Sequence, residues 1–307
     1  MLIVAALGGN ALLRRGEPLD HATERRNVGV AARALAPLAR RHRMVVTHGN
    51  GPQIGLLALQ AEAAGAAGAR PVDVLGAGTE GMIGYLIEQE LGNLLDEEVA
   101  TLLTRVEVDP HDPAFAAPDK PVGPMYDAAT ARRLAAARGW RIAADGAGWR
   151  RVMASPAPLR IVELRTIRLL VRAGVVVVCA GGGGIPVAVG GDGAAYGVEA
   201  VIDKDRSAAL LAEGLGADLL LMLTDVPNVY AGWGTAAQRP IRRAAPADFL
   251  SMELARGSMA PKVEAACRFV RRTGGTAAIG ALEDAAAIVA GEAGTTVRGD
   301  VAELELG

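Results

Sequence analysis

Short apolar runs that end directly in glycine are the feature that most constrains the fold of this chain. Residues 2–7 run into Gly8 and Gly9, and residues 175–180 run into four consecutive glycines. The runs are rich in valine, isoleucine and leucine without strict alternation, which is typical of strands buried on both faces. Segments with a helical apolar period separate them. The alternation predicts parallel βαβ units and an α/β sandwich.

The expected strands and helices follow from this reading of the apolar pattern. The expected strands are residues 2–7, 44–47, 99–108, 175–180, 219–224 and 276–279. The expected helices are residues 25–41, 80–97, 207–215 and 262–272.

One proline-rich stretch, at about residues 109–158, breaks this rhythm. It holds a short helical pattern at residues 127–138, and a group of apolar side chains that could form a small core of their own. These are Trp140, Ile142, Trp149 and Val152. Such a stretch predicts an inserted subdomain and not a linker.

Composition excludes several functional classes. The chain has 307 residues, 51% of them hydrophobic, so it can bury a large core. A net charge of -2 and only 3% aromatic residues argue against a nucleic-acid partner. The apolar start is too short to span a bilayer and no basic segment precedes it, so we expect a cytoplasmic protein with no membrane partner. Buried free thiols are the simpler interpretation of Cys179 and Cys267, although a disulfide stays open.

Lysine is scarce in this chain, which has twenty-nine arginines but three lysines, Lys120, Lys204 and Lys262. Lysine offers a compact point charge and arginine a rigid planar fork, so the remaining lysines are expected where a guanidinium fails. Chance survival on a solvated surface is the alternative. It suits one lysine better than three that all lie in glycine-, proline- or aspartate-rich surroundings.

The glycine loops favour an anionic ligand. Glycines after parallel strands let backbone N–H groups approach a ligand closely, and the next helix adds its partial positive charge. One such loop is weak evidence, but several suggest phosphate. No Gly-x-x-x-x-Gly-Lys motif and no His/Cys cluster at metal spacing is present.

Phosphoryl transfer needs positioning and positive charge, and no covalent protein nucleophile. Asp203 and Asp205 bracket Lys204. If this segment is extended, both carboxylates point to one side and Lys204 to the other, where the aspartates could orient lysines or hold Mg²⁺. A local surface ion pair is the alternative.

Several blocks, in order over nearly the whole chain, together resemble carbamate kinases, which belong to the amino acid kinase fold family. The blocks are residues 6–12, 48–55, 112–115, 120–124, 181–186, 198–205, 223–227 and 257–265. The resemblance implies an α/β fold, an open three-layer αβα sandwich with a mainly parallel central sheet and an inserted protruding subdomain. Residues 1–197 would bind carbamate or carbamoyl phosphate, with the subdomain at about 109–158, and residues 198–307 would bind the nucleotide.

The resemblance also implies an activity: reversible phosphoryl transfer between ATP and carbamate, giving ADP and carbamoyl phosphate. Mg²⁺ would be bound mainly through the nucleotide phosphates, with no metal site built by the protein. A cytoplasmic homodimer is expected, and helix 80–97, with Ile83, Leu86 and Ile87, is a plausible contributor to its interface; the alternative is that this face is only core.

The resemblance assigns a role to each lysine. Many relatives have a lysine where this chain has Ala6, and Lys120 from the insertion would replace that charge. Lys204 and Lys262 would contact the phosphates, and Asp205, with Asp203, would organise the lysines. The expected phosphate or substrate residues are Gly8, Gly9, Asn10, Gly49, Asn50, Gly51, Gly182 and Gly183. The expected nucleotide residues are Thr224, Asp225, Val226, Tyr230, Met259 and Pro261.

Two residues and two rival functions complete the expectations. Glu80 departs from a family pattern that has glutamine there, and we expect it to affect a dimer contact or the helix start and not the chemistry. His48 is expected to support its loop by hydrogen bonding. The rivals are another kinase of this fold, such as acetylglutamate kinase or an archaeal phosphate-monoester kinase, and a non-catalytic nucleotide or effector sensor.

Overall fold

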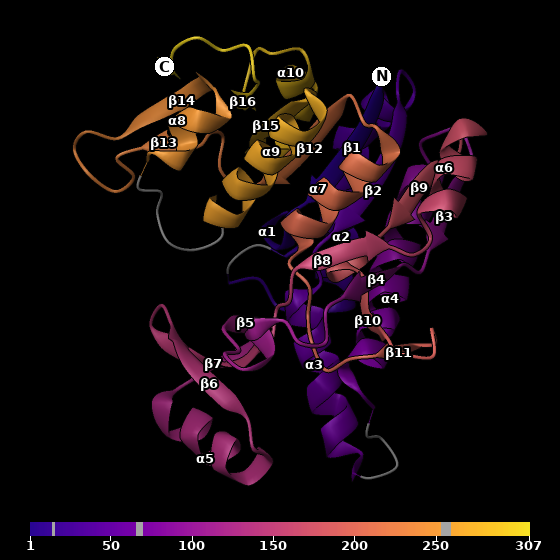
Figure 1. Cartoon of the computed structure of the whole chain (residues 1–307), viewed down its shortest axis with the longest axis vertical. Coiled ribbons are helices and arrows are strands. Elements are labelled where there is room, and N and C mark those ends of the chain that lie inside the picture. Colours follow the sequence, from indigo (N-terminus) through magenta and orange to yellow (C-terminus); the bar gives the residue numbers. More distant parts are fainter. Residues whose placement is uncertain (14–15, 66–69, 253–258) are drawn as a thin grey trace.

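The computed structural model describes residues 1–13, 16–65, 70–252 and 259–307, and leaves out the side chains of residues 10, 11, 62 and 250. Residues 257 and 258 of the last sequence block therefore lie outside the described residues. Figure 1 shows a broad layered body and, below it, a smaller unit that contains α5, β6 and β7.

The body is built on a large sheet whose central strands are parallel. These are β1 (Leu2–Leu7), β2 (Arg43–His48), β3 (Val99–Leu102), β9 (Val176–Cys179), β12 (Leu219–Thr224) and β15 (Thr276–Ala281), in the spatial order β15-β12-β1-β2-β9-β3. Beyond β15 the sheet continues through β16 (Thr295–Val297), β14 (Arg239–Ala244) and β13 (Tyr230–Ala231), and β17 (Glu305–Leu306) pairs with β14. The first strand therefore lies at the centre of the sheet, between β12 and β2.

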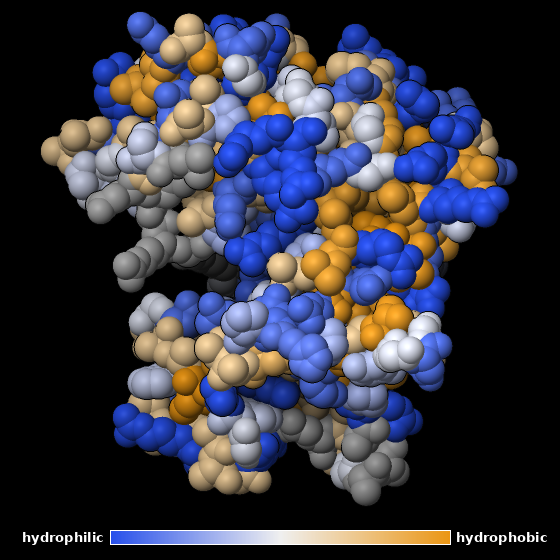
Figure 2. Space-filling model, viewed as in Figure 1, coloured by the Kyte–Doolittle hydropathy of each residue, from blue (hydrophilic) through white to orange (hydrophobic). Residues whose placement is uncertain are grey.

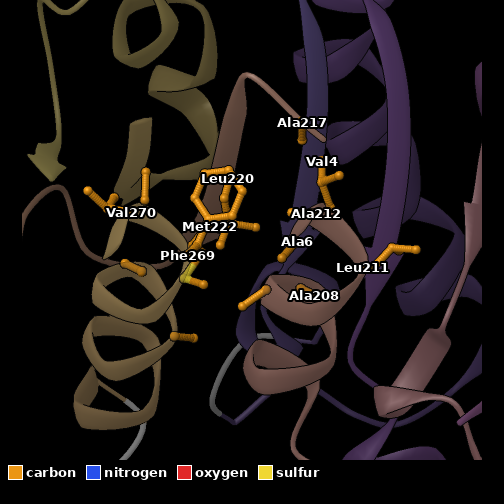
Figure 3. Packing of buried hydrophobic residues seen from close by; sticks show 14 of the residues in the cluster. Val4, Ala6, Ala208, Leu211, Ala212, Ala217, Leu220, Met222, Phe269 and Val270 are labelled. Atoms are coloured by element: carbon orange, nitrogen blue, oxygen red, sulfur yellow. The ribbon is translucent and has the colours of Figure 1, made fainter. Parts of the chain in front are cut away.

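Helices cover both faces of this sheet because side chains alternate between the faces along each strand. One face packs on α6 (Leu164–Arg172), α7 (Lys204–Leu215) and α9 (Met259–Thr273), and Val4 and Ala6 point to it. The other face packs on α2 (His21–Ala39), α4 (Val72–Gly92) and α10 (Ala285–Val289), and Ile3 and Ala5 point to it. Figure 3 shows the first of these cores, with Met222, Leu220 and Phe269 between β12 and α9. The predicted α/β sandwich with a mainly parallel sheet is confirmed.

Two smaller sheets lie beside the body. One has the order β11-β10-β4-β8, with β4 (Arg105–Val108), β8 (Pro158–Ile161), β10 (Ile185–Val189) and β11 (Ala195–Gly197). The other has the order β5-β7-β6, with β5 (Lys120–Tyr126), β6 (Arg141–Asp145) and β7 (Gly148–Met153), and α5 (Ala128–Arg138) packs on it. Three further helices are α1 (Gly9–Leu12), α3 (Gly51–Ala63) and α8 (Pro246–Leu250).

Most expected elements are present, and two expectations are wrong. Residues 99–108 form not one strand but two, because β3 pairs with β9 in the main sheet while β4 pairs with β10 and β8 in another. The chain turns at Thr104, which is fully buried and whose hydroxyl donates to the Leu102 carbonyl at 2.7 Å. The helix expected at 80–97 instead runs from Val72 to Gly92, so Glu80 lies in its interior. Its residues Ile83, Leu86 and Ile87, expected at a dimer interface, are buried in the core of the chain itself.

Among the described residues, no helix is both long and apolar enough to cross a bilayer. The cysteines are free and buried, as the sequence predicts.

A contact between two glycines seats β5 against the body. A Cβ atom on Gly55 of α3 would lie 1.9 Å from the Cα atom of Gly123 in β5. Gly123 itself has φ +73°, a conformation that favours glycine. The strand that begins with Lys120 can therefore approach α3 only because neither residue carries a side chain.

We predict that Gly55→Ala displaces β5 and lowers the free energy of unfolding by roughly 1–3 kcal/mol, the usual cost of overpacking a tight contact. Gly92→Ala is the matched control, since a Cβ atom there meets nothing within 4 Å. Urea unfolding of both variants measures the effect, and equal stability of the two would show that the contact can relax.

Candidate functional site

A large cleft of about 930 Å³ lies where the carboxyl ends of β1, β2 and β9 meet the small unit that carries β5. Figure 2 shows the molecule hollowed between the lower part, which holds α5, β6 and β7, and the upper part, which holds α8 and α9. In open α/β sheets, ligands usually bind outside the carboxyl ends of the parallel strands. They bind beside the strand at which the order of the strands along the sheet reverses its direction. Here that strand is β1.

All three lysines of the chain line this cleft, together with Asp203 and Asp205. Lys262 Nζ lies 3.1 Å from Asp205 Oδ2, and Lys204 donates to the other oxygen of the same carboxylate. Lys120, from the small unit, donates to Asp203 Oδ2. The residues of three separate segments thus meet in one charged cluster.

The N-terminus of α7 organises the cluster. Asp203 is the N-cap of this helix, and its Oδ1 accepts from the backbone N–H groups of Asp205 at 2.9 Å and Arg206 at 3.2 Å. Aspartate is a favoured N-cap because it satisfies N–H groups that have no partner in the first turn. The condition of an extended segment, which would place Lys204 opposite both carboxylates, is therefore not met: residues 203–205 form a helix start, and Lys204 turns toward Asp205.

The charges in the cluster stabilise one another. Burial by itself raises the pKa of the Asp205 carboxyl, but Lys204 and Lys262 outweigh burial and lower this pKa to about 2. Burial also raises the pKa of Asp203, and Lys120 outweighs it, so the net pKa lies below the ordinary value. Burial lowers the pKa of Lys204, against the attraction of Asp205. Both aspartates are therefore charged at neutral pH and face cations.

The glycine loops form the opposite wall of the cleft, and they pack backbone against backbone. Gly49 donates to the Leu7 carbonyl at 3.1 Å, and a Cβ atom on Gly49 would lie 3.0 Å from the Gly9 nitrogen. Gly182, at φ +67°, lies so close to the Asn50 amide that an added Cβ atom would be 2.1 Å from Asn50 Nδ2. Larger residues would close this wall of the cleft.

The structure brings together most of the predicted substrate residues. Gly9, Gly49, Asn50, Gly51 and Gly182 line the cleft. Gly8 and Gly183 lie next to lining residues and are buried, whereas the side chain of Asn10 lies outside the described residues. Pro261 is the one predicted nucleotide residue in the described lining; Thr224, Asp225, Val226, Tyr230 and Met259 are not part of it.

Several lining residues were missed by the sequence interpretation. Asp119, Asp145, Ser155 and Arg206 belong to the described lining of the cleft. Arg206 directly follows Asp205 on α7, so its position could have been inferred from a helix start. The other three lie in the small unit or next to it, and their approach to the cleft depends on how that unit folds over it.

A second buried group lies behind the glycine wall. His48 is fully buried, and burial lowers its pKa to about 4; its Nδ1 lies 3.1 Å from the Gly49 carbonyl oxygen. Glu80 of α4 accepts from the Gly181 N–H at 2.9 Å and from the Thr104 N–H at 3.1 Å. His48 is therefore neutral near pH 7 and contacts its own loop, in keeping with the supporting role expected for it.

The carboxylates of the cleft do not form a metal-binding group. The described residues contain no cluster of three or more His, Cys, Asp or Glu side chains able to hold an ion. Asp203 and Asp205 already accept from lysines. This donor set suits a metal that arrives on a ligand's phosphates better than one held by the protein.

Comparison with known proteins decides the family. The model of the amino acid kinase family matches residues 1–280. A carbamate kinase of Rhizobium meliloti is 54% identical over 308 residues, covering 99% of this chain and 95% of the relative. The chain belongs to the amino acid kinase family, among its carbamate kinases. The family resemblance seen in the sequence is thus confirmed, and with it an ATP-dependent phosphotransferase.

Solved carbamate kinases have the same architecture. The enzyme of Giardia lamblia bound to citric acid superimposes with a TM-score of 0.90 at 38% identity, covering 97% of this chain and 98% of that one. The same enzyme bound to AMP-PNP gives a TM-score of 0.88 at 39% identity, with 97% and 98% covered.

We predict that Asp205→Asn destabilises the protein by about 3–5 kcal/mol, because it leaves two buried lysines without their shared carboxylate. Asp300→Asn is the control, since Asp300 pairs with Arg298 on the exposed surface and should cost about 1 kcal/mol or less. The wild-type advantage should persist above the ordinary aspartate pKa and be lost as pH falls toward about 2, because the folded-state pKa is lowered. Urea unfolding measures both; equal small losses would contradict the organising role of Asp205.

Proposed function

We propose that this carbamate kinase catalyses reversible phosphoryl transfer between ATP and carbamate through the cluster of Lys120, Lys204 and Lys262. The convergence of these three lysines on one glycine-walled cleft carries the proposal. We also keep the predicted division, in which residues 1–197 bind carbamate or carbamoyl phosphate, residues 198–307 bind the nucleotide and residues 109–158 protrude over the cleft.

The cleft has two chemically different sides, which suits two substrates. One side presents Gly49, Asn50 and Gly182, whose short side chains and backbone leave room for a small planar anion. The other presents Lys204 and Lys262 at the starts of α7 and α9, where positive charge meets helix N-termini. We place carbamate on the glycine side and the nucleotide phosphates on the lysine side. Thr224, Asp225, Val226, Tyr230, Met259 and Pro261 remain our proposed nucleotide contacts.

The chemistry needs no protein nucleophile. A carbamate oxygen attacks the γ-phosphorus, the bond to the bridging oxygen breaks, and its electron pair leaves on ADP. Carbamate is already an anion, so no general base is required, which agrees with the low pKa of His48. Lys204 and Lys262 would stabilise charge on the transferring group, and Asp205 would hold them in place. Mg²⁺ would come with the nucleotide and neutralise part of the phosphate charge.

Lys120 would supply the remaining charge from the protruding unit. Ala6 at the end of β1 is fully buried in the core and contributes none. Lys120 lies at the start of β5 and reaches across the cleft to Asp203, at the N-terminus of α7. When substrate binds, Lys120 would leave Asp203 and contact the phosphoryl group instead. This change of partner would couple closure of the protruding unit to substrate binding.

The rival functions have less support. Relatives at about half identity over the whole chain are carbamate kinases, which does not favour acetylglutamate kinase or a phosphate-monoester kinase. A non-catalytic sensor could lose its lysines, whereas here every lysine of the chain lines the cleft. The deciding experiment is a coupled assay of ATP formation from carbamoyl phosphate and ADP, with acetylglutamate and ATP as the alternative pair. No turnover of carbamoyl phosphate would overturn the proposal.

We predict that Lys120→Ala lowers kcat by about 100-fold or more, the usual loss when one preorganised charge is removed from a transition state. The KM for ADP should change little, because Lys204 and Lys262 still bind its phosphates. Arg133→Ala is the control: Arg133 is an exposed cation on α5 of the same unit and does not belong to the described lining of the cleft. If Lys120→Ala keeps most of its turnover, the protruding unit is not catalytic.

We also propose a cytoplasmic homodimer in which α4 lies at the interface. Three large apolar side chains of this helix, Val74, Met82 and Tyr85, are about half exposed, and the equally exposed Leu103 lies beside Gly81. Apolar groups gathered on one surface are typical of protein interfaces.

We predict that the wild-type protein is a dimer at micromolar concentration and that Tyr85→Glu shifts it toward the monomer, since a charge would be buried in the interface. Leu169→Glu, at an exposed apolar position of α6, should leave the dimer intact. Light scattering after size exclusion measures both; a monomeric wild-type protein would rule out the dimer.

A further inference from the structure

Glu80 is a carboxyl group buried in the interior of α4, with 1% of its surface exposed. Its Oε1 accepts from the Gly181 N–H at 2.9 Å and its Oε2 from the Thr104 N–H at 3.1 Å. One side chain thus ties three segments together: α4, the turn between β3 and β4, and the glycine turn after β9. Neither backbone N–H would have this partner if Glu80 were apolar.

The glycine turn that Glu80 holds is part of the cleft wall. Gly181 has no room for a side chain, since a Cβ atom would lie 2.3 Å from the His48 ring and 3.1 Å from Glu80 Cγ. Gly182, next in the chain, lies against Asn50 and lines the cleft. The position of Gly181 therefore decides how far Gly182 stands from Asn50.

Asn50 is held from the same helix. Its Nδ2 donates to the Thr79 hydroxyl at 2.8 Å, and this hydroxyl donates to the Gly76 carbonyl at 2.8 Å. Thr79 and Glu80 are consecutive on α4, so a single helical turn holds the two loops that face each other on the glycine side of the cleft.

We propose that Glu80 is a positioning residue for the glycine side of the cleft, where its carboxyl group holds the Gly181 turn against Asn50 and its charge opposes the anionic substrate. The inference rests on the proposed function, because it places carbamate and carbamoyl phosphate on that side.

Several titratable groups face Glu80 from the elements around it. His48 comes from the end of β2 and is kept neutral near pH 7 by burial, which lowers its pKa to about 4; Lys204 opposes its protonation further. Cys179 comes from β9, and burial, then Glu80, raises its pKa well above the ordinary value. Glu163, before α6, repels the Glu80 carboxylate.

Glu80 itself changes charge near the working pH of an enzyme. Burial raises the pKa of Glu80 to about 8, although the N–H groups of Thr104 and Gly181 oppose the shift. Below that pH the carboxyl group is mostly neutral. Above it, a negative charge develops behind the wall that must receive an anion, so affinity for the anionic substrate should fall as pH rises through about 8.

The test compares Glu80→Gln with Glu88→Gln across about pH 6 to about pH 10. Glutamine matches the shape of the neutral carboxyl group and cannot ionise. Glu88 is the matched control, because it lies on the same helix and its carboxylate accepts the Thr101 N–H at 2.8 Å. KM is measured for carbamoyl phosphate and, separately, for ADP.

In the wild-type protein and in Glu88→Gln, the KM for carbamoyl phosphate should rise about fivefold as pH passes about 8, the size expected for one partly screened charge nearby. The KM for ADP should rise much less. Glu80→Gln should lose the carbamoyl phosphate rise. If its profile superimposes on that of the wild type, the inference is overturned.

A measurement without turnover separates this inference from the proposed function. The folded-state pKa of Glu80 is raised from 4.5 to about 8, so the folded protein holds a proton that the unfolded chain has released. Wild-type stability should therefore fall, relative to Glu80→Gln, as pH rises between these values. If the wild-type protein shows no turnover but its stability still falls with pH relative to Glu80→Gln, the proposed function alone is rejected. If stability depends on pH equally in the two proteins, the titrating role of Glu80 is rejected.

Discussion

The carboxylate of Asp205, shared by two lysines, is the interaction on which the site depends. Lys204 and Lys262 come from different helices, and like charges so close together would separate without an anion between them. Burial makes the arrangement costly to break, and the charges of Lys204 and Lys262 outweigh burial and keep Asp205 ionised far below neutral pH. In the proposed function, the lysines would therefore already be in place when an anionic ligand arrives, without reorganisation at the moment of reaction.

The parallel sheet supplies the other half of the site. Its central strands end at one edge, so the loops after β1, β2 and β9 meet although they are far apart in sequence. These loops can approach one another closely because residues 49 and 182 are glycines. A second pair of glycines, Gly55 and Gly123, lets the small unit bring Lys120 to the same place. Close backbone approach thus recurs where the glycine loops meet and where the small unit joins the body.

Helix α4 connects these features from behind. Its residues Thr79 and Glu80 hold the two loops of the glycine side, and its opposite surface presents Met82 and Tyr85 to the exterior. In the proposed dimer, the helix that supports the cleft wall would also form the subunit contact. A change at the interface would then reach the cleft by a short path through one rigid element.

The amino-acid sequence is enough to predict the α/β class, the glycine loops and the three lysines that line the cleft. Strands 2–7 and 219–224 were predicted to the residue, because buried parallel strands leave a continuous apolar run. Lysine scarcity identified Lys120, Lys204 and Lys262 because a strong compositional bias makes each exception informative.

How these parts meet depends on the packing of the whole chain. Local pattern joined residues 99–108 into one strand, whereas pairing with β9 and with β10 divides them between two sheets. It left the conformation of residues 203–205 open, whereas in the structure the Asp203 cap makes them a helix start. From the sequence, Glu80 was expected to affect a helix start or a dimer contact. Its contacts with Gly181 and Thr104 could not be predicted, because these residues are distant from it in sequence. The period of the apolar residues indicates which side of a helix or strand is buried. Which other element packs against that side is set by the folding of the whole chain.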